Sequence, residues 1–374
     1  MGFDFTIAVA PSSTSLDKEF QYIKSALLYA DKVTLISPMA YLYTQLSRNQ
    51  HNEHTALRLL NLVMPFCRMA NPEFYDDSQP VISQFTDLLN SKKYKAVPTI
   101  KRLEIRRMLQ GFGKAVQDTI ESRIGEEQCS ELKKLLRADK LILQKFEHPL
   151  DDAEGCTVEF FNLLTSSIHN AYPLFDEQSS ALMKAAVDEK LVCLNDFNRK
   201  KITHAGVSDN FIQRLPSFDA ASVDEILDIK KELAAPLVRF RSKMLAYTDD
   251  VQSAPWDDDF EMECLQLYIK EVQPALLEIQ ELTKENSFIK NLGRSFFTDE
   301  ASIKSVGGLV VSIAAAGVLK AFSEAASTNA AVYLGGTLGV PKVASAYVAY
   351  RQANREIEKK DLYFYYKAGK QLER

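Results

Sequence analysis

The chain has 374 residues, of which 46% are hydrophobic and 25% charged, enough apolar material for roughly two to three domains. Its formal net charge of −5 argues against attraction of the whole surface to nucleic acid or anionic lipid, although a local basic patch is compatible with it. The five cysteines form no CxxC pair, which argues against a zinc ribbon or a disulfide scaffold. No secretory signal precedes the first strand, so we expect a cytoplasmic protein with free thiols.

The first forty residues predict a β–α–β unit. Phe3–Ala10 alternates as a strand does, residues 17–30 carry apolar side chains at helical spacing, and the β-rich run KVTLISP ends at Pro38. Strands that flank a helix usually pair in parallel, so we expect a small, partly parallel sheet, to which Leu191–Leu194 could add a strand. Open α/β sheets bind ligands at their strand ends. Whether this unit has a pocket there stays open.

Most of the remaining chain has a helical pattern. The best-marked helix begins at Ser222, which forms a capping-box spacing with Glu225. Pro236 lies inside the same apolar stripe and should kink the helix or divide it in two. A second long helix is expected from about Phe260 to Lys284, with Pro274 inside it.

The polar segment YTDDVQSAPWDDD is the best linker candidate, and it places a domain boundary near residue 250. We therefore expect an N-terminal domain over residues 1–250 and a C-terminal helical domain over 251–374. The fold class predicted is mainly α: a helical bundle with a small N-terminal β-α-β sheet element and a C-terminal Gly/Ala-rich helical hairpin.

The hairpin is predicted over residues 305–350, which are rich in glycine and alanine. Its uncharged runs, 305–319 and 325–341, are fifteen and seventeen residues long, whereas a membrane span needs about 20 apolar residues. Small residues let two helix backbones approach closely. We expect a buried hairpin, with triggered membrane insertion, as in pore-forming toxins, as the alternative.

A basic segment, residues 91–114, contains eight Lys or Arg against the single acid Glu104. On a helix that begins at Ile100, the apolar Ile100, Leu103 and Phe112 would face inward. Lys101, Arg102 and Arg106 would then face outward. Such a face suits a phosphate backbone or an acidic protein, and the alternative is a solvated face neutralised by the protein's own acidic surface. The nucleic-acid-binding candidates are Lys101, Arg102, Arg106 and Arg107.

Two further clusters contain residue types that bind metals. The acidic run 249–263 could bind a hard cation or could serve a helix start, where carboxylates are favoured. His51 and His54 are one residue short of a zinc-binding pattern, and the other histidines are isolated in sequence. GFGK at 111–114 lacks the length of a P-loop. The sequence therefore indicates no cofactor, no metal and no catalytic residue, and it favours a protein that is not an enzyme.

The chain ends in an amphipathic segment with clustered aromatic residues. These could dock on their own domain or form an edge that binds a partner. The interaction candidates are Tyr363, Phe364, Tyr365 and Tyr366.

Three segments together resemble a group of uncharacterised bacterial proteins: ALLYADKVTLISP, SVDEILDIKKEL…LVRFRSKML, and the Gly-rich hairpin followed by REIEKKDLYFYYK. Proteins of that group are often encountered near mobile elements and phage-defence genes, which implies a role in defence and defines no catalytic residue.

The leading hypothesis is a cytoplasmic bacterial protein that acts through protein–protein contacts, as a sensor or adaptor in anti-phage defence, with a protein partner or as a homo-oligomer. The alternatives are a membrane-active effector that inserts the 305–350 hairpin and a nucleic-acid binder or nuclease that uses residues 91–114.

Overall fold

A computed structural model describes most of the chain: residues 2–10, 16–46, 72–91, 97–148, 153–285 and 351–373, with Tyr94 and single positions between 53 and 68. The predicted 305–350 hairpin lies outside the described residues. In the part that is described, no helix is both long and apolar enough to cross a bilayer.

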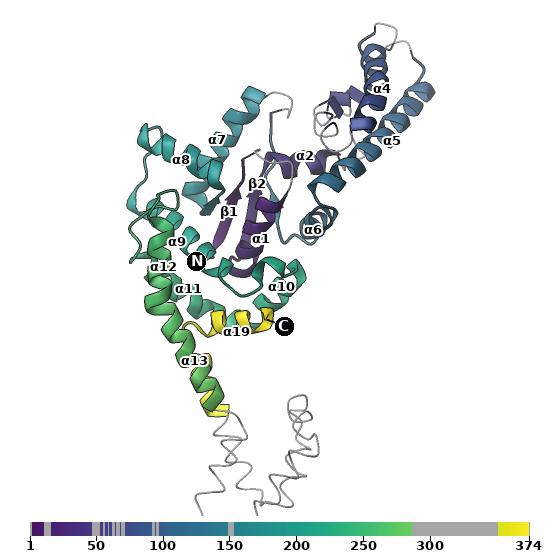
Figure 1. The fold of residues 1–374 in the computed structure, drawn as a ribbon. Coiled ribbons are helices and arrows are strands. Elements are labelled where there is room, and N and C mark those ends of the chain that lie inside the picture. Colours follow the sequence, from purple (N-terminus) through teal and green to yellow (C-terminus); the bar gives the residue numbers. More distant parts are fainter. Residues whose placement is uncertain are drawn as a thin grey trace, which may run out of the picture. The chain divides into compact units, whose positions relative to one another are not determined.

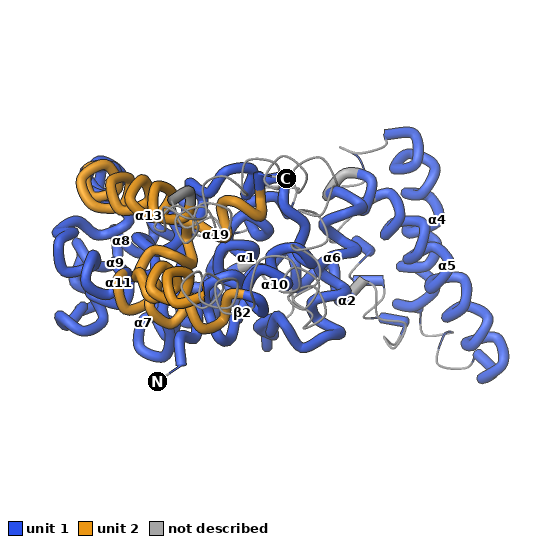
Figure 2. Tube along the Cα trace, turned by 90° about the horizontal axis from the view of Figure 1, so that it is seen from below, with its two compact units in different colours: residues 1–232, 244–265, 373 blue, residues 233–243, 266–372, 374 orange. Residues whose placement is uncertain are grey.

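The chain divides into two compact units (Figure 2). Unit 1 comprises Met1–Glu232, Met244–Leu265 and Glu373, and unit 2 comprises Leu233–Lys243, Gln266–Leu372 and Arg374. The boundary expected near residue 250 remains a prediction.

The fold is mainly α, as expected, with a small parallel sheet in unit 1 (Figure 1). The strands are β1 (Asp4–Ala8), β2 (Lys32–Ile36), β3 (Ile142–Leu143) and β4 (Tyr172–Phe175). They lie in the order β3-β2-β1-β4, and all three neighbouring pairs are parallel. The predicted β–α–β unit is therefore confirmed.

The strand suggested for Leu191–Leu194 is not formed, so this prediction is wrong. These residues form a connection that follows Lys190, whose φ is 60°, and Leu191 is 74% exposed. Val192 and Leu194 pack against the core from this connection instead. An apolar run of four residues cannot distinguish a strand from a loop that packs on a core, and the sheet position beside β1 is taken by β4.

Helices cover both faces of the sheet. Helix α1 (Asp17–Tyr29) connects β1 to β2 and contacts both, whereas α7 (Ala153–Asn170) precedes β4 and contacts β2 and β4. The two crossovers run in opposite directions along the sheet, so right-handed connections place these helices on opposite faces. Under α7, the side chains of Ala8, Ile36 and Phe175 share one core cluster.

Further helices follow in chain order. They are α2 (Pro38–Leu46), α4 (Pro72–Asn90), α5 (Thr99–Ile124), α6 (Glu126–Arg137), α8 (Glu177–Asp188), α9 (Asp196–Gln213), the short η2 (Phe218–Ala220), α10 (Val223–Glu232), α11 (Ala234–Thr248), α12 (Phe260–Leu267), α13 (Gln273–Glu285) and α19 (Tyr363–Leu372). Helix α9 contacts both β4 and α1, and α10 packs against α1.

The predicted capping box at Ser222 and the predicted division of the helix at Pro236 are both confirmed. The Ser222 hydroxyl accepts a hydrogen bond from the Glu225 N–H at 3.3 Å, and the Glu225 carboxylate accepts one from the Ser222 N–H at 2.8 Å, which is the predicted capping box. The helix then stops at Glu232 and restarts at Ala234, because Pro236 has no N–H for the Glu232 carbonyl. Ahead of Pro274, a π-helical turn over Tyr268–Val272 links α12 to α13.

One glycine in unit 1 is required by close packing. A Cβ added to Gly206 in α9 would lie 2.6 Å from the Pro255 Cγ and 2.8 Å from the Phe260 Cζ. Gly113 in α5 has no such neighbour within 4 Å. We therefore expect Gly206→Ala to lower the free energy of unfolding by about 1–3 kcal/mol through overpacking.

Gly113→Ala is the matched control, and it should raise the free energy of unfolding by about 0.5–1 kcal/mol because alanine is the better helix former. Urea titrations followed by circular dichroism measure both variants. Equal effects of the two substitutions would contradict the close packing at Gly206.

Candidate functional site

The carboxyl ends of all four strands lie at one edge of the sheet because every pair is parallel. The chain leaves β1 toward β2 on one side, and β4 joins β1 on the other. In open α/β sheets, ligands bind in the crevice outside the carboxyl ends at such a change of direction. This edge is therefore the first place to look for a site.

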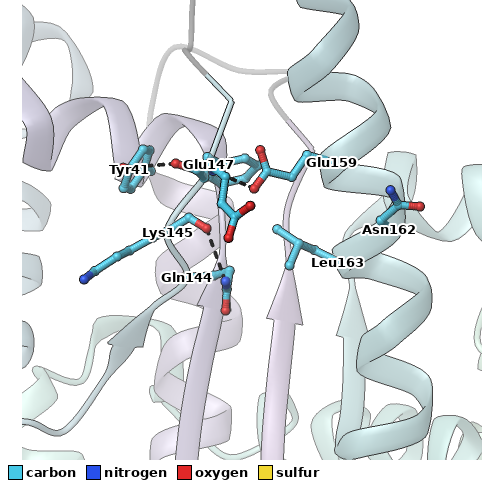
Figure 3. Close-up of a pocket in the computed structure, with 8 residues that line it drawn as sticks. Tyr41, Gln144, Lys145, Glu147, Glu159, Asn162 and Leu163 are labelled. Carbon is cyan, nitrogen blue, oxygen red and sulfur yellow. Dashed lines mark hydrogen bonds between the residues drawn. The ribbon is translucent and has the colours of Figure 1, made fainter.

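A cavity of about 580 Å³ opens at this edge beside β2 and β3 (Figure 3). Its lining mixes aromatic, amide and charged side chains and comes from α2, the segment after β3, and α7: Tyr41, Gln144, Lys145, Phe146, Glu147, Glu159, Asn162 and Leu163. In Figure 3, the Glu147 carboxylate points into the space between the strand ends and α7, whereas the Lys145 side chain extends away from it.

Hydrogen bonds hold the wall of the cavity in place. The Glu159 carboxylate accepts the backbone N–H groups of Glu147 at 2.6 Å and His148 at 2.9 Å. The Tyr41 hydroxyl donates to the Phe146 carbonyl at 3.3 Å, and their ring centroids lie 5.5 Å apart. Glu159 is therefore occupied by the backbone, and Glu147 is left exposed as the carboxylate available to a ligand.

Four buried polar side chains lie at the same edge, at the ends of β2 and β4 and the starts of α1 and α8: Ser37, Asp176, Glu19 and Ser179. The Ser37 hydroxyl donates to Glu19 Oε1 at 2.8 Å and accepts the Ala40 N–H at 3.0 Å, which caps α2. Asp176 Oδ1 accepts the N–H groups of Ser179 at 3.0 Å and Ala10 at 3.3 Å. One oxygen of each carboxyl group is thus held firmly.

The second oxygen of each carboxyl group is left over. Glu19 is 2% exposed and Asp176 is fully buried, yet Glu19 Oε2, Asp176 Oδ2 and the Ser179 hydroxyl have no hydrogen-bond partner among the described residues. Native proteins leave few buried polar atoms without a partner. Such a concentration at a strand-end crevice is typical of a site that is completed by a water or a ligand.

Burial raises the pKa of Glu19 from 4.5 to about 7, and the negative charge of Asp176 raises it further, against the lowering effect of the Ser37 hydrogen bond. The Glu19 carboxyl group can therefore carry or release a proton near neutral pH. A cation or a hydrogen-bond donor placed beside it would favour the charged form.

The basic segment is divided by the structure. The Arg102 Nε and Nη2 donate to the carbonyls of Val97 at 3.1 Å and Tyr94 at 3.3 Å, and the Arg106 Nε lies 3.6 Å from Glu53 Oε1. Lys101 and Arg107 are exposed. Two of the four candidate residues are therefore engaged within the protein.

The predicted orientation of this helix is wrong in part. Ile100 is 73% exposed and Leu103 49% exposed, although both were expected to face inward. Phe112 does face inward and stacks on Phe74. Among the described side chains of α5, Leu109 and Val116 are buried, because the rotation of a helix about its axis is set by the elements that pack on it as well as by its own pattern.

The C-terminal aromatic residues lie in unit 2. Phe364 and Tyr365 are buried, with ring centroids 5.2 Å and 5.8 Å from that of Phe240, and Tyr268 contacts Tyr365 at 6.4 Å. Tyr363 and Tyr366 are half-buried. The structure thus shows that Phe364 and Tyr365 dock within their own unit.

No group of three or more metal-ligating side chains occurs among the described residues. In the acidic run, Asp257 Oδ2 accepts the Ala254 N–H at 2.9 Å, and Glu263 Oε2 accepts the Gln252 N–H at 2.7 Å. These carboxylates organise the turn before α12. His51 lies outside the described residues, and the ring of His54 meets that of Tyr94 edge-on at 6.1 Å.

His204, isolated in sequence, is a core residue of unit 1. Its Nε2 lies 2.9 Å from the Tyr29 hydroxyl and its Nδ1 lies 3.0 Å from the Thr248 hydroxyl. Both ring nitrogens are therefore satisfied inside the protein.

Comparison of the chain with protein-family models, curated proteins and solved structures found no match. The candidate site thus rests on the geometry of the carboxyl edge. The sequence predicted the β–α–β unit and left open whether its strand ends carry a pocket; it did not single out Glu19, Asp176 or the cavity residues. Asp176 directly before a helix was a readable capping signal, whereas nothing local marks Glu19 among the other acids of α1.

The raised pKa of Glu19 predicts how stability varies with pH. Between about pH 4.5 and about pH 7, the folded chain holds a proton that the unfolded chain has released, so its stability falls as pH rises, by about 3 kcal/mol at most. Glu19→Gln keeps the acceptor for Ser37 and removes the charge. It should abolish this fall and be the more stable protein at about pH 8.

Urea unfolding of both proteins, from about pH 5 to about pH 8, measures the difference. The exposed neighbour of Asp176 supplies the control, since Glu177→Gln should retain the wild-type trend. A constant difference between wild type and Glu19→Gln over this range would show that Glu19 titrates normally.

Proposed function

We propose that this chain is a cytoplasmic sensor that binds a small molecule at the carboxyl edge of its sheet and signals through protein–protein contacts in anti-phage defence. The observation that carries the proposal is the cavity of about 580 Å³ at the strand ends. Pockets of this size enclose small ligands, and this location is the common one in open α/β sheets.

The lining indicates the class of ligand. Tyr41, Phe146 and Leu163 offer apolar and aromatic surface, while Gln144 and Asn162 supply amide groups. The free Glu147 carboxylate adds a negative charge. A small, partly planar molecule with hydrogen-bond donors or a positive charge fits this chemistry.

Two observations support the cellular setting. Among the described residues, Cys129, Cys156, Cys193 and Cys264 form no disulfide, which fits a reducing compartment. The resemblance of three segments to proteins found near phage-defence genes supplies the biological role, and a sensor of infection needs both a ligand site and a surface that contacts a partner.

Filling the cavity tests the proposal. Leu163→Trp places a large side chain in the cavity, and Glu147→Gln removes the charge without changing the shape. We expect cells that express the wild-type chain to lower the plating of at least one phage, and both variants to lose about tenfold or more of that protection. Native mass spectrometry of wild-type protein from infected cells should show a bound small molecule that Leu163→Trp lacks.

The control is Leu182→Trp, a matched substitution at an exposed position of α8 in the same unit, which should protect as wild type does. Circular dichroism must show that Leu163→Trp is folded. Full protection by both cavity variants would rule out the cavity as the sensing site, and no protection by the wild type against a broad phage panel would reject the role in defence.

A further inference from the structure

Ser37 and Asp176 occupy equivalent positions at the carboxyl edge of the sheet. The strand register aligns the residues before them, Ile36 and Phe175, with Ala8 of β1. The ladder of hydrogen bonds continues past β4, because the Asp176 N–H donates to the Ala8 carbonyl at 3.2 Å. Neighbouring strands lie about 4.8 Å apart, so the end of β1 separates the backbones of Ser37 and Asp176 by about 10 Å.

Both side chains point to the face of the sheet that α1 covers. Successive residues of a strand point to opposite faces, and Ile36 and Phe175 belong to the core cluster under α7. The residues that follow them therefore point toward α1, which brings Glu19 Oε1 to within 2.8 Å of the Ser37 hydroxyl. Besides burial, the negative charge of Asp176 raises the pKa of Glu19. The two carboxyl groups thus share one face and lie within electrostatic reach of each other.

Three oxygen atoms at this place are left over by the hydrogen bonds of the protein. Glu19 Oε2, Asp176 Oδ2 and the Ser179 hydroxyl have no hydrogen-bond partner among the described residues, and each of these residues is 2% exposed or less. Ser179 lies directly beside the Asp176 carboxylate, to which its N–H donates at 3.0 Å. No lysine or arginine of the described chain therefore neutralises either free carboxyl oxygen.

The chemistry of this set favours a hard cation. Buried carboxylates are costly unless they are paired or coordinate a metal. The unused atoms are all oxygen, the ligand type that Mg²⁺ and Ca²⁺ prefer, whereas Zn²⁺ sites usually contain histidine or cysteine. Mg²⁺ is commonly held by one or two carboxylates while water completes its coordination, so a set with two carboxylates is sufficient.

We propose that Glu19, Asp176 and Ser179 bind one divalent cation, Mg²⁺ or Ca²⁺, at the carboxyl edge of the sheet. The cation would neutralise two buried charges and give a partner to all three unused oxygen atoms. It would also tie the first turn of α1 to the first turn of α8. The site uses none of the residues that line the cavity, so it stands or falls separately from the sensor proposal.

Calorimetric titration of the full-length chain is the first test. Protein freed of metals with a chelator is titrated with Mg²⁺ and, in a separate experiment, with Ca²⁺. We expect one site per chain and a dissociation constant below about 1 mM for at least one of the two cations. At about 10 mM of that cation, the midpoint of thermal unfolding should rise by about 2 °C or more, because the ligand binds the folded chain alone.

Substitution of each ligand locates the site. Glu19→Gln keeps an acceptor for Ser37, and Asp176→Asn keeps a side chain that caps α8, so each removes a charge with little change of shape. Each should weaken binding of the cation by about tenfold or more. Ser179→Ala removes only the unused hydroxyl and should weaken binding by about threefold or more.

The neighbouring residues supply matched controls. Glu177→Gln removes an exposed charge next to Asp176. Ser180→Ala removes a hydroxyl that donates to the Phe175 carbonyl at 3.4 Å. Both variants should bind the cation as the wild type does, and circular dichroism should show that every variant is folded.

Three results would overturn the proposal. One is a folded wild type that binds neither cation up to about 10 mM, which would leave protons and water to satisfy the free oxygens. Another is binding that neither Glu19→Gln nor Asp176→Asn weakens. Should both of those variants fail to fold, the serine pair decides, because equal affinities of Ser179→Ala and Ser180→Ala would place the cation elsewhere.

Discussion

The parallel hydrogen bonding of β1 to both β2 and β4 is the constraint on which unit 1 depends. Parallel strands cannot be joined by hairpins, so each connection must cross the sheet, and the crossings supply α1 and α7 on opposite faces. The same geometry brings every strand to its carboxyl end at one edge. Polar groups that lie far apart in the chain therefore meet at this edge, and helices α2 and α8 begin there as well.

That meeting has an energetic consequence. Glu19 and Asp176 each hold one carboxyl oxygen in a defined hydrogen bond and leave the other buried without a partner among the described residues. A core that served stability alone would replace such groups with apolar side chains. Natural proteins tolerate this kind of local conflict mainly where function requires it. The buried pair and the neighbouring cavity thus point to the same edge, one through its electrostatics and the other through its shape.

The distribution of charge follows a similar logic. In α5, Arg102 donates hydrogen bonds to two backbone carbonyls and Arg106 lies beside Glu53, whereas Lys101 and Arg107 are exposed. In unit 2, the aromatic rings of Phe364 and Tyr365 are buried against Phe240 and are not available to a partner. The surfaces left for partners are therefore fewer than the composition suggests.

The sequence by itself determined the features that depend on neighbours along the chain. Alternation in Phe3–Ala10 and helical spacing in residues 17–30 predicted β1 and α1, the Ser222–Glu225 pair predicted a helix start, and Pro236 predicted its division, because these signals act within a few residues. Only the tertiary structure decided the rest. The two-residue β3 exists because β2 offers it hydrogen bonds. The outward turn of Ile100 depends on what covers the other side of α5. The Asp176 hydrogen bond to Ala10 joins residues 166 positions apart, and such a pairing has no local signature in either segment.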